Sequence, residues 1–285
     1  MSPRDVILAM LPPVLWAVAY TLAKPATAAF PPLFLASRAY GLTAVVLFKP
    51  WTRHETPIWA ILAAATLGAS VQSALIFNGI ARVEASVAIL VVQPQVPFAV
   101  FGAWAIAKQP LNWKRMAGSF VALCGIALVV GLPALAGQTK GLLLIVLGTL
   151  SWGIGQGIIA AASRDSGARF MGALAAVASP QLLLLSLITE TGQWQAIAYA
   201  RVADWTAVVV LAVGGFVAAY SIWYGLLQRY NVDQIAPFVL LMPVAGLASA
   251  FIFLGERPTW PILAGGAIIT LGVALVVLTS DSRKL

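Results

Sequence analysis

The chain has 285 residues, of which 61% are hydrophobic and only 9% are charged. Soluble domains carry about 25% charged residues, so this composition excludes a soluble enzyme, a disordered chain and a disulfide-rich scaffold. It predicts an integral membrane protein. The net charge of +8 is interpreted as basic loops that face an anionic membrane surface, with no nucleic-acid partner. The single Cys124 provides no intrachain disulfide and no cysteine metal site, and no cofactor is expected.

Ten apolar stretches follow one another between the charged residues. Most hold about 16–22 residues, enough for an α-helix to cross a hydrocarbon core ~30 Å thick, and none alternates like a barrel strand. The expected fold is therefore an all-α integral membrane protein with ten transmembrane helices. The stretches cover residues 6–22, 33–48, 59–78, 86–107, 116–131, 141–162, 170–188, 205–224, 235–254 and 261–278.

The Lys and Arg residues of the predicted loops indicate the orientation. Eleven of the 17 lie on the side of the N-terminus, five lie on the other side, and Arg38 lies inside the second stretch. Because cytoplasmic loops carry the excess of Lys and Arg, both termini are predicted to be cytoplasmic.

An internal repeat relates the fifth apolar stretch to the tenth. Residues 113–130 align with residues 260–277 at an offset of 147, with eight identities that include a Trp and two Gly. Pro97 and Pro243 correspond at an offset of 146, so the similarity extends to the preceding stretches.

We infer two halves, residues 1–135 and 136–285, with five helices each. An odd number of helices per half places the halves in opposite orientations across the membrane. Such inverted repeats are typical of secondary transporters, which bind substrate near the midplane between the halves. A duplicated scaffold without transport is the alternative.

Aromatic and amide side chains inside the stretches are the candidates for solute binding. Trp16 and Tyr20 share one helix face, and Trp152 and Gln156 repeat that spacing in the second half. Interfacial aromatic belts and glutamine bridges between helices are the alternatives, although both Trp residues lie well inside their stretches. A wall of Trp and Tyr with a few amides suits an amphiphilic solute with an apolar body. The candidate substrate-binding residues are Trp16, Tyr20, Arg38, Asn78, Gln93, Trp152, Gln156 and Tyr224.

Arg38 is the charged residue that lies clearly within a stretch. Two roles are consistent with its position. Its long side chain can reach the membrane interface as an anchor, or its guanidinium can face a central cavity and bind a carboxylate.

Prolines interrupt the fourth and ninth stretches. Proline in a helix interior frees a carbonyl, so these residues are either hinges for alternating access or packing kinks. The predicted hinge residues are Pro94, Pro97, Pro237 and Pro243.

A membrane-embedded enzyme is not expected. The stretches contain no His, no Cys/His set and no central carboxylate pair, so the sequence offers no site for acid–base or metal chemistry. No metal site is predicted.

The pattern resembles the drug/metabolite transporter superfamily, specifically its EamA-type ten-helix exporters. The resemblance rests on two five-helix halves, Trp16 and Trp152, the prolines of the fourth and ninth stretches, and the sequence Leu-Gly-Glu-Arg-Pro at 254–258. It covers essentially the whole chain and is strongest to the YddG-type amino-acid exporters of that group. It implies export of aromatic and other neutral or apolar amino acids across the bacterial inner membrane, and it implies that Glu256 is a structural helix-end residue.

One departure concerns energy coupling. Four-helix multidrug members of the superfamily use a glutamate in the first helix to exchange protons for cations, and the first stretch here has no acid beyond Asp5 at its mouth. Carboxylate-based proton antiport of cations is therefore disfavoured. Export of cationic drugs by a transporter of the same superfamily is the alternative function. The chain is expected to act as a monomer on a small-molecule amino-acid substrate, within the lipid bilayer.

Overall fold

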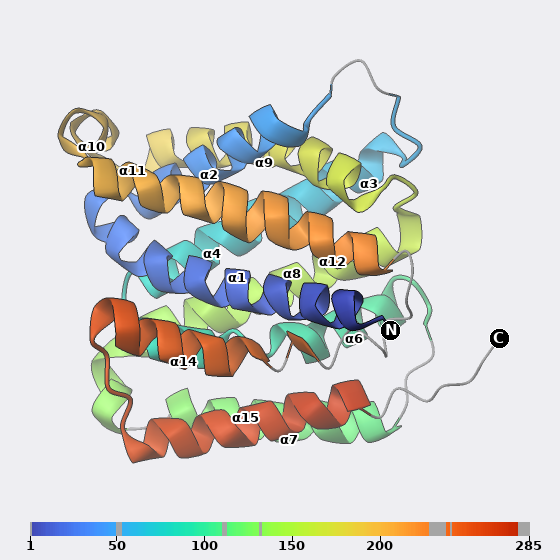
Figure 1. The fold of residues 1–285 in the computed structure, drawn as a ribbon, viewed down its shortest axis with the longest axis vertical. Coiled ribbons are helices and arrows are strands. Elements are labelled where there is room, and N and C mark those ends of the chain that lie inside the picture. The colour runs from blue at the N-terminus through green and yellow to red at the C-terminus, as the bar shows by residue number, and fades with distance from the viewer. Residues whose placement is uncertain are drawn as a thin grey trace.

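A computed structural model describes residues 2–49, 53–109, 113–130, 133–227, 238–239 and 241–278. Within this part of the chain all regular secondary structure is helical. The long helices run side by side, and the short helix α10 is seen end on because it lies across their ends (Figure 1).

The helices follow the predicted stretches. Among the described residues, six helical segments are long and apolar enough to cross a membrane, and four shorter apolar helices accompany them. The count of ten transmembrane helices stays a prediction. The helices and helical segments are α1 (Pro3–Ala29), α2 (Pro32–Leu47), α3 (Ile58–Ala65), η1 (Thr66–Val71), α4 (Gln72–Ile80), α5 (Ala85–Val91), α6 (Gln95–Ala105), α7 (Trp113–Val130), η2 (Pro133–Gln138), α8 (Thr139–Ala162), α9 (Gly167–Thr189), α10 (Gln193–Tyr199), α11 (Val202–Val209), η3 (Val210–Ala218), α12 (Ala219–Leu227), α14 (Leu241–Leu254) and α15 (Trp260–Leu278).

The first helix is longer than its predicted stretch, which ended at residue 22. α1 begins at a cap in which the Asp5 backbone N–H donates to the Ser2 hydroxyl, and it continues to Ala29. Lys24 lies inside the helix, where its ammonium donates to the Ala81 carbonyl oxygen at 3.0 Å. The charge therefore does not end the helix, because it finds a backbone acceptor on a neighbouring segment.

One of the predicted hinge prolines lies at a helix break, and two others lie in the first turn of a helix. Pro94 lies at the break between α5 and α6, whereas Pro97 and Pro243 occupy the first turns of α6 and α14. Proline is tolerated in a first turn because that backbone N–H has no helical partner. Pro237 lies outside the described residues.

Two π-helical segments, η1 and η3, were not predicted. They join α3 to α4 and α11 to α12 without any proline. Hydropathy cannot distinguish a π-turn from an α-turn, since both keep the same apolar residues in the membrane.

Close packing depends on glycine at several crossings. α15 packs along α7, α9 along α2, and α8 lies against both α4 and α6. At the α6–α8 crossing, a Cβ on Gly102 would overlap the carbonyl oxygen of Gly153, so the two backbones are in direct contact. Small residues at such contacts are typical of membrane helices.

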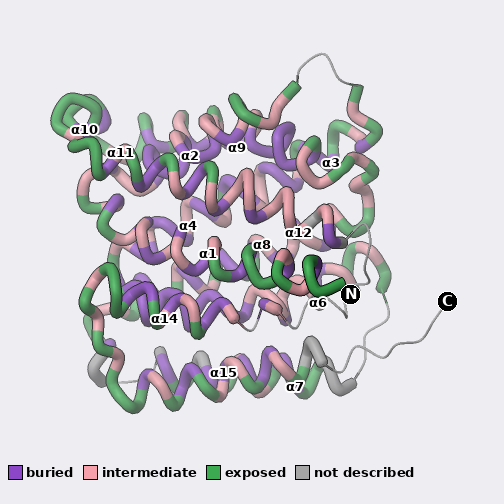
Figure 2. The backbone as a smooth tube through the Cα atoms, viewed as in Figure 1, coloured by how far each residue is buried: buried purple, intermediate pink, exposed green. Residues whose placement is uncertain are grey.

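Burial follows this packing. Figure 2 shows buried stretches along α2, α9 and α14, and exposed residues over α10 and the start of α1. Large apolar side chains are exposed on the outer helices, among them Leu184, Leu187 and Ile188 of α9. A surface of this kind is suited to lipid contact.

Candidate functional site

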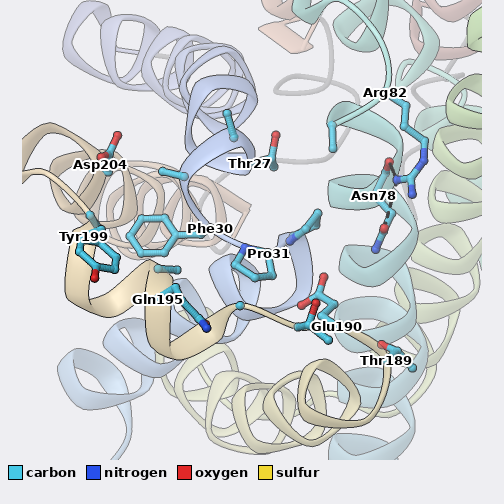
Figure 3. A pocket seen from close by; sticks show the side chains of 18 residues that line it. Thr27, Phe30, Pro31, Asn78, Arg82, Thr189, Glu190, Gln195, Tyr199 and Asp204 are labelled. Atoms are coloured by element: carbon cyan, nitrogen blue, oxygen red, sulfur yellow. Dashed lines mark hydrogen bonds between the residues drawn. The ribbon is translucent and has the colours of Figure 1, made fainter.

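A cavity opens at the end of the bundle opposite Pro3. Its volume is about 960 Å³, and its walls come from the α1–α2 turn, the end of α4, the end of α9, α10 and the start of α11. Figure 3 shows Phe30 and Tyr199 on one side and Asn78 with Arg82 on the other. The lining thus combines aromatic rings, amides and hydroxyls with a few charged groups.

Asn78 is the predicted site residue that lines this cavity. Its amide donates to the Ala74 carbonyl oxygen at 3.0 Å, and its side-chain oxygen accepts from Arg82 at 3.1 Å. These bonds fix the amide at the rim of the cavity, next to a guanidinium.

A second group of functional candidates lies midway along the helices. Trp16 of α1 contacts Tyr220 and Trp223, with ring centroids 5.3 and 5.5 Å apart. Tyr40 of α2 stacks on Phe216 at 4.6 Å. We call the whole group the central aromatic cluster, defined as Trp16, Tyr20, Tyr40, Trp152, Phe216, Tyr220 and Trp223.

Both halves of the chain contribute to the cluster. Tyr20 lies near the Gln72 side chain, and Tyr220 lies near the Trp152 indole. Ser73 donates to the Tyr40 hydroxyl at 3.2 Å, so α4 contributes a polar edge to the cluster. Three of the predicted residues, Trp16, Tyr20 and Trp152, are therefore brought together.

The cluster provides uncharged recognition groups. Its described members offer phenol hydroxyls, indole N–H groups and π-faces, and none of these side chains is charged at neutral pH. Aromatic faces attract an ammonium group, and hydroxyls and indoles donate to a carboxylate. Such a set can bind both charged ends of a zwitterion.

Three further predicted residues are not members of the central aromatic cluster. Gln93 is buried and donates to the Ile89 carbonyl oxygen at 3.0 Å, at the α5–α6 break. Gln156 lies on α8 one turn beyond Trp152 and is half-buried. Tyr224 lies in α12, but its side chain is outside the part that the structure describes.

Arg38 is half-buried on α2. Its guanidinium carbon lies 4.9 Å from the centre of the Phe34 ring, and its Nε donates to the Ser37 hydroxyl at 3.2 Å. Both contacts are to its own helix, and Arg38 is not among the residues that line the cavity. The two sequence-based roles for this residue remain predictions.

The sequence analysis did not select Tyr40, Gln72, Ser73 or Phe216. The adjacent Gln72 and Ser73 were the available signal, because two neighbouring polar side chains in the middle of an apolar stretch need partners in a membrane. Tyr40 and Phe216 carry no such signal on their own.

A family model described as the EamA-like transporter family matches residues 4–131 and again residues 139–278. The chain belongs to this family. The predicted membership is thereby confirmed, and the EamA protein is a multi-pass membrane transporter and not an enzyme.

Two curated relatives cover the whole chain, and a third covers most of it. Proteins of Salmonella typhimurium and of Escherichia coli, each named "Probable amino-acid metabolite efflux pump", are 30% identical over 100% of this chain and 98% of their own. A "Probable terminal-alkyne amino-acid exporter" of Streptantibioticus cattleyicolor is 26% identical over 81% of this chain and 76% of its own. One solved crystal structure covers 98% of both chains with a TM-score of 0.62 at 18% identity, which shows the same fold.

Acidic residues in the second half of the chain cap helix starts in the first half. The carboxylate of Glu256 accepts the backbone N–H groups of Ala85 and Ser86 at the start of α5, both at 2.8 Å. Gly255, with a φ of 68°, ends α14 in the left-handed region and turns the chain so that Glu256 reaches α5. This geometry agrees with the structural role that the resemblance implied.

Glu190 caps the start of α2 in the same way. Its carboxylate accepts the backbone N–H groups of Leu33 at 2.8 Å and Phe34 at 3.1 Å, and Ser186 donates to it at 2.7 Å. Because the N-terminal end of a helix carries partial positive charge, both glutamates stabilise the helices that they contact.

A reciprocal contact joins the loop before α3 to the loop between α8 and α9. Asp165 accepts the backbone N–H groups of Glu55 and Thr56, and the Thr56 hydroxyl accepts those of Arg164 and Asp165. His54 lies 3.1 Å from the Asp165 carboxylate. Burial opposes the charge of Asp165, but the hydrogen bonds from Thr56, Glu55 and His54 outweigh it and hold its pKa below the usual value.

Proposed function

We propose that this chain exports aromatic and other neutral amino acids, and related small metabolites, from the bacterial cytoplasm. The observation that carries the proposal is the uncharged central aromatic cluster, to which α1 and α2 contribute from one half and α8, η3 and α12 from the other. The names of the full-length relatives support the same substrate class.

The proposed mechanism is alternating access by rocking of two inverted halves, residues 1–135 and 136–285. The double match of the family model agrees with these limits. We place the chain in the bacterial inner membrane with both termini in the cytoplasm. The 960 Å³ cavity lies at the end of the bundle opposite Pro3, so it then faces the outside. The contacts between Thr56 and Asp165 then close the cytoplasmic end. One chain supplies both walls of the path, so we propose a monomer.

In this scheme the side chain of the substrate packs against the Trp and Tyr rings near the midplane. Its ammonium lies over an aromatic face, and its carboxylate accepts from hydroxyl, indole or amide donors such as Gln156. Opening of the outer end exposes the substrate to the cavity, where Asn78 and Arg82 line the exit.

The test is transport into proteoliposomes of labelled Phe, Trp and Leu and of a quaternary ammonium dye, with and without a pH gradient. Saturable flux of the amino acids supports the proposal, whereas flux of the dye alone contradicts it and favours a cationic-drug exporter. Trp152→Ala and Gln156→Ala are expected to reduce amino-acid flux, and unchanged flux in both would remove these residues from the site.

A further inference from the structure

The two π-helical segments occupy corresponding places in the two halves. The offset of 146 residues that relates Pro97 to Pro243 carries residues 66–71 onto residues 212–217, which lie within η3. π-Helical turns are rare and occur preferentially at functional sites. Two of them at matching positions therefore indicate a shared role.

Each π-helical segment crosses a long helix at close range. Gly68 of η1 meets Gly155 of α8, where a Cβ on Gly68 would lie 3.0 Å from the Gly155 Cα. Gly215 of η3 meets Ala19 of α1, where an added Cβ would lie 3.0 Å from the Ala19 Cβ. The offset of 136 residues that relates Trp16 to Trp152 also relates Ala19 to Gly155. Gly68 and Gly215 differ by 147, the offset that relates the fifth and tenth stretches, so the two crossings lie at corresponding places in the two halves.

At each crossing, the long helix donates a side-chain hydrogen bond to a π-helical carbonyl. The Ser151 hydroxyl of α8 donates to the Leu67 carbonyl oxygen at 2.7 Å. The Trp16 indole of α1 donates to the Gly215 carbonyl oxygen at 3.0 Å. A carbonyl oxygen has two lone pairs, so each of these donors adds one hydrogen bond to a π-helical turn.

The π-helical segments lead directly into the central aromatic cluster. η1 is followed by Gln72 and Ser73, and η3 contains Phe216 and precedes Tyr220. A change from π-helical to α-helical bonding shifts the register of the following residues by one, which rotates them about the helix axis by ~100°. The side chains of the cluster would move with that change.

We propose that Ser151 and Trp16 are positioning residues that hold these two π-helical joints, and that transport requires the joints to rearrange. This inference rests on the proposed function as an alternating-access exporter. It assigns to Ser151 a role that solute contact does not explain, and it gives the Trp16 N–H a role separate from that of its ring.

Ser151 provides the cleaner test, because it is not a member of the aromatic cluster. Ser151→Ala removes the hydroxyl and Ser151→Thr retains it. Ser179→Ala is the matched control, since the Ser179 hydroxyl donates between helices at 3.0 Å to the Ser37 carbonyl oxygen of the α-helical α2. For α1, Trp16→Phe removes the N–H and keeps an aromatic ring.

Two measurements are made on the full chain in lipid nanodiscs and proteoliposomes. Hydrogen–deuterium exchange of peptides that cover 66–71 is expected to be about fivefold faster in Ser151→Ala, as for the loss of one ordinary hydrogen bond. Peptides that cover 210–218 should respond in the same way to Trp16→Phe. In transport, Ser151→Ala should change kcat more than KM, and Ser151→Thr should restore both readouts.

The possible outcomes distinguish a failure of the proposed π-helical joints from a failure of the proposed transport function. Unchanged exchange at 66–71 in Ser151→Ala, or an equal change there in Ser179→Ala, overturns the proposed joint. Faster exchange with normal kcat overturns its role in transport. Absence of amino-acid flux in the unmodified protein contradicts the proposed function instead, while the exchange data still decide whether the two side chains hold the π-helical segments.

Discussion

Replacement of Glu256 by Ala is expected to destabilise the protein, although this residue lies far along the chain from the helix that it stabilises. Its carboxylate accepts two backbone N–H groups at 2.8 Å, from Ala85 and Ser86. Both donors are buried, with exposures of 1% and 0%. Hydrogen bonds to a charged group contribute about 1.5–3 kcal/mol each, and water replaces part of that at the half-buried carboxylate. The expected loss in the free energy of unfolding is thus about 2–4 kcal/mol.

Glu84 offers a matched control for this prediction. It is the N-cap residue of the same helix, it carries the same charge, and its side chain makes no capping hydrogen bond. Unfolding by titration of SDS into dodecylmaltoside micelles, followed by circular dichroism, compares Glu256→Ala, Glu256→Gln and Glu84→Ala. Glu256→Gln keeps one acceptor oxygen and should lose about half as much as Glu256→Ala. Equal stability of Glu256→Ala and Glu84→Ala would refute the assignment of the cap to Glu256.

Three further predictions concern packing, pH and the central cluster. Gly102→Val should destabilise the protein by about 1–3 kcal/mol in the same unfolding assay, because α6 and α8 leave no room for a side chain; wild-type stability would contradict the backbone contact. The pKa of Asp165 is lowered on folding, so its contribution to stability is complete above about pH 4 and is lost as the pH falls through the folded pKa. The difference in thermal stability between wild type and Asp165→Asn should therefore shrink below that pH, and a constant difference would argue against the charge. Tyr220→Phe removes a phenol hydroxyl from the central aromatic cluster and should raise the KM for aromatic amino acids in proteoliposome flux, while an unchanged KM would place that hydroxyl outside the solute path.

The course of the helices was predictable because hydropathy is a property of each stretch by itself. The structure follows the predicted stretches, and it extends α1 past Lys24, since the ammonium finds the Ala81 carbonyl oxygen. That acceptor belongs to a segment 57 residues further along the chain. A boundary rule based on charge alone has no access to such a partner.

The site was predictable only in part, for a similar reason. Trp16, Tyr20 and Trp152 stood out because polar aromatic groups inside a membrane need partners. Tyr40 and Phe216 meet only in three dimensions, where the rings stack at 4.6 Å. The π-helical segments were not predictable from proline positions either, because their wide turns are stabilised by Ser151 and Trp16 from other helices.

In the capping contacts of Glu190 and Glu256, one half of the chain supplies backbone N–H donors and the other half supplies side-chain carboxylates. Leu33, Phe34, Ala85 and Ser86 contribute only their backbone N–H groups, which every residue except proline possesses. The acceptors are carboxylates of fixed length on the other half, where even the exchange of Glu for Asp shortens the reach by one methylene. The capping contacts therefore constrain the two halves differently. They require only a backbone N–H at the helix starts of the first half, where burial sets the side chains, whereas the second half must keep an acid of the right length at each matching position.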